Sequence, residues 1–284
     1  MATVLPFCCI RPREDLACRT AALPYDVYSR REAREAAKKE PLSFLNIDRP
    51  ETQFTEDTDM YSDEVYAKAA ELLDARMADG TYIEDGQKCY YVYELIMEGR
   101  HQTGIAACAS IDDYLGNMIK KHENTREEKE RDRVRHVDAC NAQTGPIFLA
   151  YRSSDAISQA VRRAKETEKL FGFTADDGVT HNVWRIADGE LQSAIRDGFA
   201  AVESIYIADG HHRAASAVRV GLQRRAEHPD YDGTEEFNYF LSVLFPEEEL
   251  RILPYNRVVR DLNGLTPEEF LSRTSERFAV ERLG

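Results

Sequence analysis

An apolar segment, a short polar turn and an alanine-rich segment follow one another directly between residues 204 and 219. The apolar segment predicts a strand, and the alanine-rich segment predicts a helix. This junction constrains the fold strongly, because it leaves no spare residues for a loop between the strand and the helix. The turn itself consists of Asp209, Gly210, His211, His212 and Arg213.

The residue types of this turn suit a phosphate group. Gly210 lets the backbone approach a ligand closely, and the first N–H groups of the following helix have no partners within the helix. His211, His212 and Arg213 add cationic or hydrogen-bond donor groups at the same place. We therefore predict that Gly210, His211, His212 and Arg213 bind phosphate.

Two other interpretations of the turn stay open at this point. The tetrapeptide Ile-Ala-Asp-Gly recurs at residues 186–189 without histidines, so the same residues can form a solvated surface turn. Zinc is the weaker functional alternative, because adjacent histidines on a helix point about 100° apart. No cysteine lies nearby to complete a zinc site.

The composition is that of a folded, acidic protein. The chain has 284 residues, of which 43% are hydrophobic and 31% charged, so it can bury a core as one large domain or two smaller ones. Its net charge of −14 argues against nonspecific binding to nucleic acid. Six cysteines are scattered without Cys-x-x-Cys spacing, and no long apolar segment occurs. We expect a soluble, cytoplasmic protein that binds no membrane.

Helix and strand patterns alternate along the chain. Two strands at 89–97 and 103–110 are joined by the hairpin signal Glu98-Gly99. Further predicted strands lie at 147–151, 181–186 and 237–245, an extended segment lies at 43–47, and helices lie at 29–39, 62–78, 154–170 and from Thr266 onward. The expected fold class is α+β, with a mixed sheet and flanking helices.

A strongly charged helix is predicted after residue 125. Thr125 can cap this helix, and Glu128 can complete a capping box. The helix has few apolar residues, so it faces either solvent or a polar cleft, and both interpretations stay open. At the other end of the chain, residues 277–282 begin to resemble a new strand, which predicts that the sequence is part of a longer protein.

Four segments together resemble one protein family. The chain is similar to the bacterial and archaeal proteins grouped as domain of unknown function 1015, and the resemblance covers almost its whole length. The segments that carry it occur in the family's order, at residues 23–27, 120–126, 141–146 and 206–213. Members are usually longer than this chain. The resemblance implies a single family domain over 1–284 that is truncated at its C-terminus.

The Asp-Gly-His-His-Arg turn is also similar to one in the free serine kinase SerK and in the siderophore-pathway protein SbnI, which belong to the ParB and sulfiredoxin fold group. This similarity implies a nucleotide-binding core at 112–223 that carries a large inserted segment. SerK has a His-Glu pair upstream of its turn, and here His122-Glu123 matches that pair. About 85 residues separate the pair from the turn here, far more than in SerK.

The resemblance to SerK implies a base role for Glu123, and the residue types of the other motifs suggest further roles. Glu123, Asp209 and His212 are the expected catalytic residues, with Glu123 accepting the proton of an incoming hydroxyl. Asp209 orients His211 or binds Mg²⁺, and the nucleotide is ATP or ADP. Residues expected to contact substrate or phosphate are His122, Arg126, Asn141, Gln143 and Thr144. A helix-terminal role for Glu123 and a turn role for 141–144 are the alternatives.

Three functions of different classes therefore stay open. The first is a nucleotide-dependent phosphotransferase that acts on the hydroxyl of a small molecule, such as free serine. The second is a nucleotide-binding switch or slow NTPase of the ParB type, which needs no acceptor. The third is a non-catalytic protein whose His-His-Arg turn binds an acidic group. The sequence names neither the acceptor nor the oligomeric state.

Overall fold

The computed structural model describes residues 1–254, 256 and 258–281. The chain divides into two units, Met1–Leu250 and Arg251–Gly284, and each is described by itself. In the second unit, α10 (Pro267–Ser275) begins where the sequence predicts a helix start, and a capping box between Thr266 and Glu269 closes its first turn. Residues 277–281 form no strand, and the last residue of that predicted strand, Arg282, lies outside the described residues.

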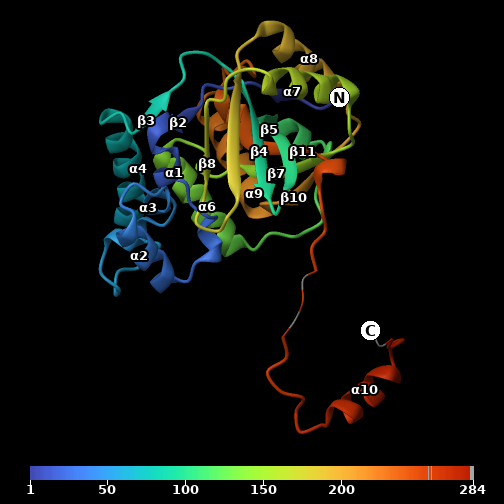
Figure 1. The fold of residues 1–284 in the computed structure, drawn as a ribbon. Helices are drawn as coiled ribbons and strands as arrows, with labels where there is room; N and C mark the ends of the chain where they lie inside the picture. The colour runs from blue at the N-terminus through green and yellow to red at the C-terminus, as the bar shows by residue number, and fades with distance from the viewer. Residues whose placement is uncertain (255, 257, 282–284) are drawn as a thin grey trace. The chain divides into compact units, whose positions relative to one another are not determined.

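The first unit is built on a nine-stranded mixed sheet within the described residues, in the order β6-β10-β7-β11-β5-β4-β9-β8, with β1 paired to β5 (Figure 1). β7 and β11 are parallel, as are β6 and β10, and the other pairs are antiparallel. The strands are β1 (Val4–Leu5), β4 (Tyr90–Met97), β5 (Arg100–Ser110), β6 (Ile119–Lys120), β7 (Ile147–Tyr151), β8 (Phe171–Thr174), β9 (Thr180–Ile186), β10 (Ile205–Asp209) and β11 (Tyr239–Pro246). A separate ribbon pairs β2 (Ile10–Pro12) with β3 (Tyr82–Glu84).

Helices flank this sheet, which confirms the predicted α+β class. In Figure 1, α7 and α8 lie together, and α2, α3 and α4 form a separate group. The α-helices of this unit are α1 (Ala17–Thr20), α2 (Arg30–Lys39), α3 (Leu45–Asp48), α4 (Asp63–Ala78), α5 (Ile111–Leu115), α6 (Glu127–Cys140), α7 (Asp155–Lys165), α8 (Gly189–Ala200) and α9 (His211–Glu227). Short 3-10 helices occur at Glu14–Leu16, Tyr25–Val27, Pro50–Gln53, Glu236–Asn238 and Glu247–Glu249.

The hairpin between β4 and β5 forms where the sequence predicts it. Glu98 and Gly99 both have positive φ, at 51° and 76°. A two-residue turn with both φ values positive matches the right-handed twist of the strands that it joins. The hairpin therefore follows from local chain geometry alone.

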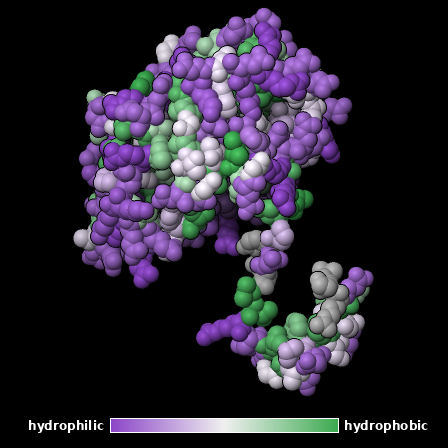
Figure 2. Space-filling model, in the orientation of Figure 1, coloured by the Kyte–Doolittle hydropathy of each residue, from purple (hydrophilic) through white to green (hydrophobic). Residues whose placement is uncertain are grey.

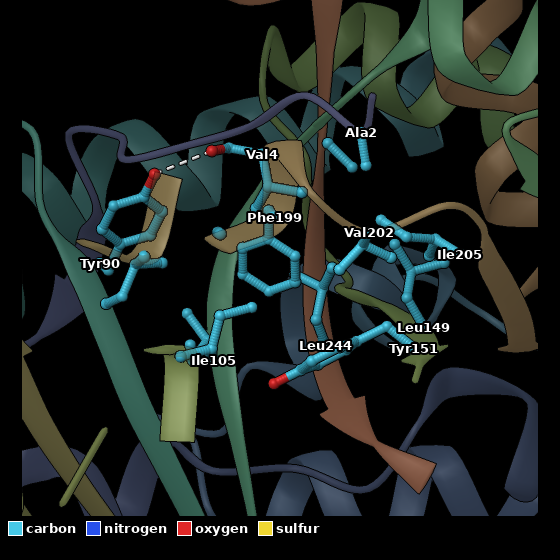
Figure 3. Close-up of a cluster of buried hydrophobic side chains, with 14 of the residues drawn as sticks. Ala2, Val4, Tyr90, Ile105, Leu149, Tyr151, Phe199, Val202, Ile205 and Leu244 are labelled. Atoms are coloured by element: carbon cyan, nitrogen blue, oxygen red, sulfur yellow. Dashed lines mark hydrogen bonds between the residues drawn. The ribbon is translucent and has the colours of Figure 1, made fainter. Parts of the chain in front are cut away.

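The main hydrophobic core includes side chains of the sheet and of α7, α8 and α9 (Figure 3). Tyr90 and Phe199 are fully buried there, and each contributes about 1.5–3 kcal/mol of apolar burial. The hydroxyl of Tyr90 donates to the carbonyl of Val4 at 2.8 Å. This bond joins β4 to β1 of the N-terminal segment.

Three local predictions were wrong. Residues 43–47 are not extended, because Ser43 Oγ accepts the N–H of Leu45 and the chain turns into α3, burying Leu45 and Ile47. The helix predicted at 154–170 ends at Lys165. The capping box of Thr125 and Glu128 is absent: Arg126 is the N-cap of α6 without a side-chain cap. Thr125 Oγ1 instead donates to Glu130 Oε2 at 3.0 Å.

Gly221 allows close packing of α9 against the 3-10 helix at Glu236–Asn238. A Cβ atom at Gly221 would overlap the carbonyl oxygen of Phe237 and lie 2.8 Å from Ile111 Cδ1. We therefore expect Gly221→Ala to lower the free energy of unfolding by about 2 kcal/mol, measured by urea denaturation. Gly189→Ala is the control, because nothing lies within 4 Å of its Cβ position. Equal stability of the two variants would contradict the prediction.

Candidate functional site

The predicted phosphate turn joins β10 directly to α9. Gly210 is the N-cap of α9 and has φ +91°, a backbone conformation that favours glycine. No side chain caps the helix, and the first helical bond runs from the N–H of Ala214 to the carbonyl of Gly210. The N–H groups of residues 211–213 precede that bond, so the turn has the donor geometry of an anion site.

Arg213 connects this turn to the 141–146 segment. Its guanidinium donates to Asp209 Oδ2 at 2.7 Å and to the carbonyl of Pro146 at 2.5 Å. A Cβ atom at Gly210 would lie 3.0 Å from Arg213 Nε, and one at Gly145 would lie 3.4 Å from Arg213 Cδ. The two glycines therefore leave the space that the Arg213 side chain occupies.

The His122-Glu123 pair lies beside the same turn. β6 runs parallel to β10, so the residues that follow β6 reach the start of α9. The N–H of His122 donates to His211 Nε2 at 3.4 Å, and Glu123 Oε2 lies 3.5 Å from His211 Nδ1. The edge of one imidazole packs on the face of the other, with ring centroids 4.4 Å apart. Two segments that are distant in sequence thus meet at one site.

His211 and Glu123 have contrasting environments. His211 is 5% exposed, and its burial, together with the neighbouring His122, lowers its pKa. Because Nε2 accepts a hydrogen bond from the backbone, the neutral imidazole carries its proton on Nδ1, toward Glu123. The side chain of Glu123 is 69% exposed, so its other carboxylate positions are open to a ligand.

A small polar cavity of about 440 Å³ opens at this pair. The ammonium of Lys121 lies 4.1 Å from the ring centroid of Tyr114 on its wall. The residues that line it are Tyr114, Lys121, His122, Glu123, Asn124, Thr125 and His211. This composition suits a small hydrophilic molecule.

A second, larger cavity of about 900 Å³ has Arg213 in its lining. It is bounded by the N-terminal segment, α6, the 141–146 segment and the strands β4, β5, β8, β9 and β11. Its walls are mainly apolar. Figure 2 shows hydrophobic residues gathered in the middle of one face of the first unit, with hydrophilic residues around them.

Part of the lining of the large cavity is polar, and we call this part the polar recess: Asp48, Tyr82, His136 and Thr144. Thr144 Oγ1 donates to Asp48 Oδ1 at 3.0 Å and lies 3.5 Å from His136 Nδ1. His136 Nε2 is bonded to the carbonyl of Ile47 at 2.8 Å. The polar side chains are therefore held in place from three different segments of the chain.

Arg133 is buried beside this recess on α6. Its guanidinium donates to Asp132 Oδ2 at 3.0 Å, lies 4.0 Å from Asp48 Oδ1, and packs 4.3 Å from the ring centroid of Tyr25. His136 follows on the same helix face, one turn later. Of the two interpretations of the charged helix, the polar cleft therefore describes this face.

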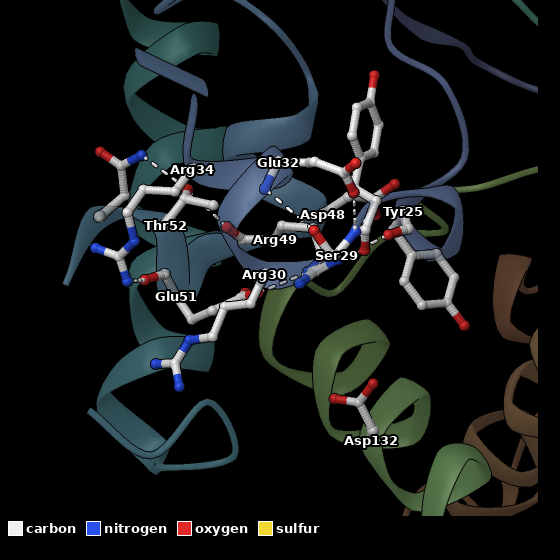
Figure 4. Close-up of polar contacts among 12 residues, drawn as sticks. Tyr25, Ser29, Arg30, Glu32, Arg34, Asp48, Arg49, Glu51, Thr52 and Asp132 are labelled. Atoms are coloured by element: carbon white, nitrogen blue, oxygen red, sulfur yellow. Dashed lines mark hydrogen bonds and ion pairs between the residues drawn. The ribbon is translucent and has the colours of Figure 1, made fainter. Parts of the chain in front are cut away.

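A buried ion pair holds the 23–27 segment at the cavity. Arg49 donates to Glu51 Oε1 at 2.6 Å and to the carbonyls of Tyr25 and Tyr28 at 2.9 and 3.0 Å. Figure 4 shows Arg49 between Glu51 and Tyr25. Because the two charges compensate each other and the carbonyls are satisfied, this arrangement can exist inside the protein.

The predicted site residues divide into three groups. Glu123, His122 and His211 line the small cavity, and Asn141, Gln143, Thr144 and Arg213 line the large one. Asp209 adjoins Arg213 instead of His211. Four predicted residues line neither cavity: Arg126, Asp209, Gly210 and His212. His212 Nδ1 is buried without a hydrogen-bond partner in the described residues.

Sequence reasoning missed four residues of the large cavity: Asp48, Tyr82, Arg133 and His136. Arg133, His136 and Cys140 form a buried line along α6, and their three- and four-residue spacing was the available signal for α6. No comparable signal marked Asp48 or Tyr82. Their place depends on how α3, β3 and α6 pack against α4.

His136 predicts a pH dependence of stability. Burial and the charge of Arg133 lower its pKa, with Asp48 and Asp132 opposing the shift. Below about pH 6.5 an unfolded histidine binds a proton that folded His136 does not, so stability falls as the pH falls. We expect wild type to lose about 1 kcal/mol more than His136→Asn between pH 7 and pH 5 in urea unfolding. The exposed His228→Asn is the control, and equal losses for wild type and His136→Asn would contradict the prediction.

Comparison with known proteins supports the family and leaves the function open. No curated protein and no solved structure matches the chain significantly. Within the described residues, no helix is long and apolar enough to cross a membrane, and no cluster of three His, Cys, Asp or Glu side chains is placed to hold a metal. The family model described as "Protein of unknown function (DUF1015)" matches residues 4–283. The chain therefore belongs to the DUF1015 family.

Proposed function

We propose that this protein is a nucleotide-dependent phosphotransferase that acts on the hydroxyl of a small molecule, such as free serine. The observation that carries the proposal is the contact between Glu123 and the Gly210–Arg213 turn, which lie about 85 residues apart in the sequence. A carboxylate beside an anion-binding turn supplies the two groups that phosphoryl transfer to a hydroxyl requires. The proposal includes a ParB- and sulfiredoxin-like relationship for the core at 112–223.

The turn binds the phosphates of the nucleotide in this proposal. The free N–H groups at the start of α9 donate to phosphate oxygens, and Arg213 neutralises charge on the transferred group. Arg213 is already oriented by Asp209 and Pro146, so binding costs little side-chain ordering.

Glu123 acts as the general base in this proposal. The acceptor occupies the small cavity, and its hydroxyl oxygen attacks the terminal phosphorus of the nucleotide while its proton passes to Glu123. The bond from that phosphorus to the bridging oxygen breaks, and the shortened nucleotide leaves with the electron pair. His211, whose Nδ1 faces Glu123, positions the carboxylate.

Mg²⁺ fits the site as a partner of the nucleotide. Asp209 offers one largely exposed carboxylate beside the turn, and the described residues hold no larger cluster of ligands. Mg²⁺ in such sites commonly takes one or two carboxylates together with substrate phosphates. When bound, the ion would neutralise charge on the phosphates.

Calorimetric titration with ATP, ADP and CTP in the presence of Mg²⁺, followed by an assay of phosphoryl transfer to free serine, tests the proposal. Binding with transfer supports it. Binding with slow hydrolysis and no dependence on an acceptor would favour the nucleotide switch. Absence of binding to all three nucleotides would refute the proposal and favour a non-catalytic role for the His-His-Arg turn.

A further inference from the structure

We propose that Lys121 binds a carboxylate group of the acceptor in the small cavity, so that the acceptor is a small hydroxy acid. This inference rests on the proposed function and deepens it, because it names the chemical class of the acceptor and a residue that selects it. The site is the same cavity of about 440 Å³ that Glu123 and His211 line.

The first argument is the position of Lys121 on the wall of the small cavity. Lys121 directly follows β6, and its ammonium lies 4.1 Å from the ring centroid of Tyr114, which belongs to α5. The attraction between a cation and an aromatic face favours this place for the ammonium. Lys121 is also exposed, so a ligand in the cavity can reach it. The neighbouring Lys120, the last residue of β6, is not among the residues that line the cavity.

The second argument is that the charge of Lys121 has no partner within the part of the chain that the structure describes. None of the ion pairs there includes Lys121, although acidic side chains outnumber lysine and arginine by 51 to 37 in the chain. An ammonium has three N–H donors and no acceptor. A carboxylate satisfies such donors and compensates the charge at the same time.

The third argument is the arrangement of charges that an acceptor meets. The cavity lining has one lysine and one carboxylate, Lys121 and Glu123, and burial lowers the pKa of His211, so its imidazole is neutral at pH 7. In the proposed function the acceptor hydroxyl lies at Glu123, which leaves Lys121 for a second group of the same molecule. A carboxylate is attracted to Lys121, whereas the ammonium of an amino alcohol would be repelled by it. The cavity therefore favours a hydroxy acid over an amino alcohol or a neutral polyol.

The test pairs two hydroxy acids with counterparts that lack the carboxylate: L-serine with L-serinamide, and D-glycerate with glycerol. Steady-state phosphoryl transfer by the full chain, with the magnesium nucleotide that wild type binds best, gives kcat/KM for each compound. Wild type should prefer each acid about 10- to 100-fold, the effect of one charge-assisted hydrogen bond. In Lys121→Met this preference should disappear through a higher KM for the acids, while kcat/KM for the two counterparts stays unchanged.

Two matched variants serve as controls. Lys121→Arg keeps the positive charge and should keep most of the preference for acids. Lys120→Met removes the adjacent lysine, which does not line the cavity, and should leave all four values as in wild type. Nucleotide affinity, measured by calorimetry, should be the same in all of these variants, because Lys121 contacts the acceptor in this inference and not the phosphates.

The outcomes separate this inference from the proposed function. If wild type transfers phosphate to serinamide or glycerol as well as to the acids, or if Lys121→Met keeps the preference, the inference fails and the phosphotransferase proposal stands. A loss of nucleotide affinity in Lys121→Met would assign the lysine to phosphate and would also overturn the inference. If wild type binds nucleotide and transfers phosphate to none of the four compounds, the inference fails and the nucleotide switch replaces the phosphotransferase.

Discussion

Glu123→Gln is expected to reduce phosphoryl transfer roughly 100- to 10,000-fold while nucleotide affinity stays nearly unchanged. Glutamine keeps an oxygen that can face His211 Nδ1, so the local geometry is retained, but it cannot accept the proton of the attacking hydroxyl. Single-turnover transfer measures the first quantity, and calorimetry measures the second.

Glu127→Gln is the matched control for this substitution. Glu127 is an exposed acid nearby in the chain, in the first turn of α6, and it pairs only with Arg131 in the described residues. Its loss should leave transfer unchanged. Full activity of Glu123→Gln would remove the general base from the proposal, and a loss of nucleotide affinity in that variant would assign Glu123 to binding.

Arg213→Ala is expected to weaken nucleotide binding about 10- to 100-fold, because it removes a charge-assisted hydrogen-bond donor beside the phosphates. Transfer should fall with it. Arg213→Lys should recover only part of the affinity, since lysine lacks the planar fork that contacts Asp209 and Pro146 together. Calorimetry with MgATP measures all three proteins.

Arg219→Ala is the corresponding control on the same helix. Arg219 is exposed and pairs with Glu130, away from the turn. Thermal melting of each variant distinguishes a loss of binding from a loss of fold, since Arg213 also holds the 141–146 segment. Unchanged nucleotide affinity in a folded Arg213→Ala variant would refute the phosphate assignment.

The segments that carry the family resemblance lie near one another around the start of α9 and the two cavities. The 141–146 segment and the 209–213 turn meet at the guanidinium, and the 120–126 segment reaches His211. The 23–27 segment lines the large cavity through Tyr25. All four segments that carry the family resemblance therefore line one of the two cavities or contact the turn between β10 and α9.

The sequence by itself determined the features that depend on neighbouring residues. The strand-turn-helix at residues 205–227 and the hairpin at Glu98-Gly99 follow from local apolar pattern and from backbone conformations that glycine favours. The same local logic was wrong at 43–47. There the burial of Leu45 and Ile47 favoured a helical turn over an extended segment.

Only the tertiary structure decided how distant segments combine. The parallel pairing of β6 with β10 places Glu123 beside His211. The packing of α3, β3 and α6 against α4 brings Asp48 and Tyr82 to the cavity that His136 also lines. These contacts are selected by the order in which the strands pair and by the free energy of burying whole helix and sheet faces. A local sequence pattern indicates whether a segment is a helix or a strand and which of its faces is apolar. It does not specify which other segment will pack against that face.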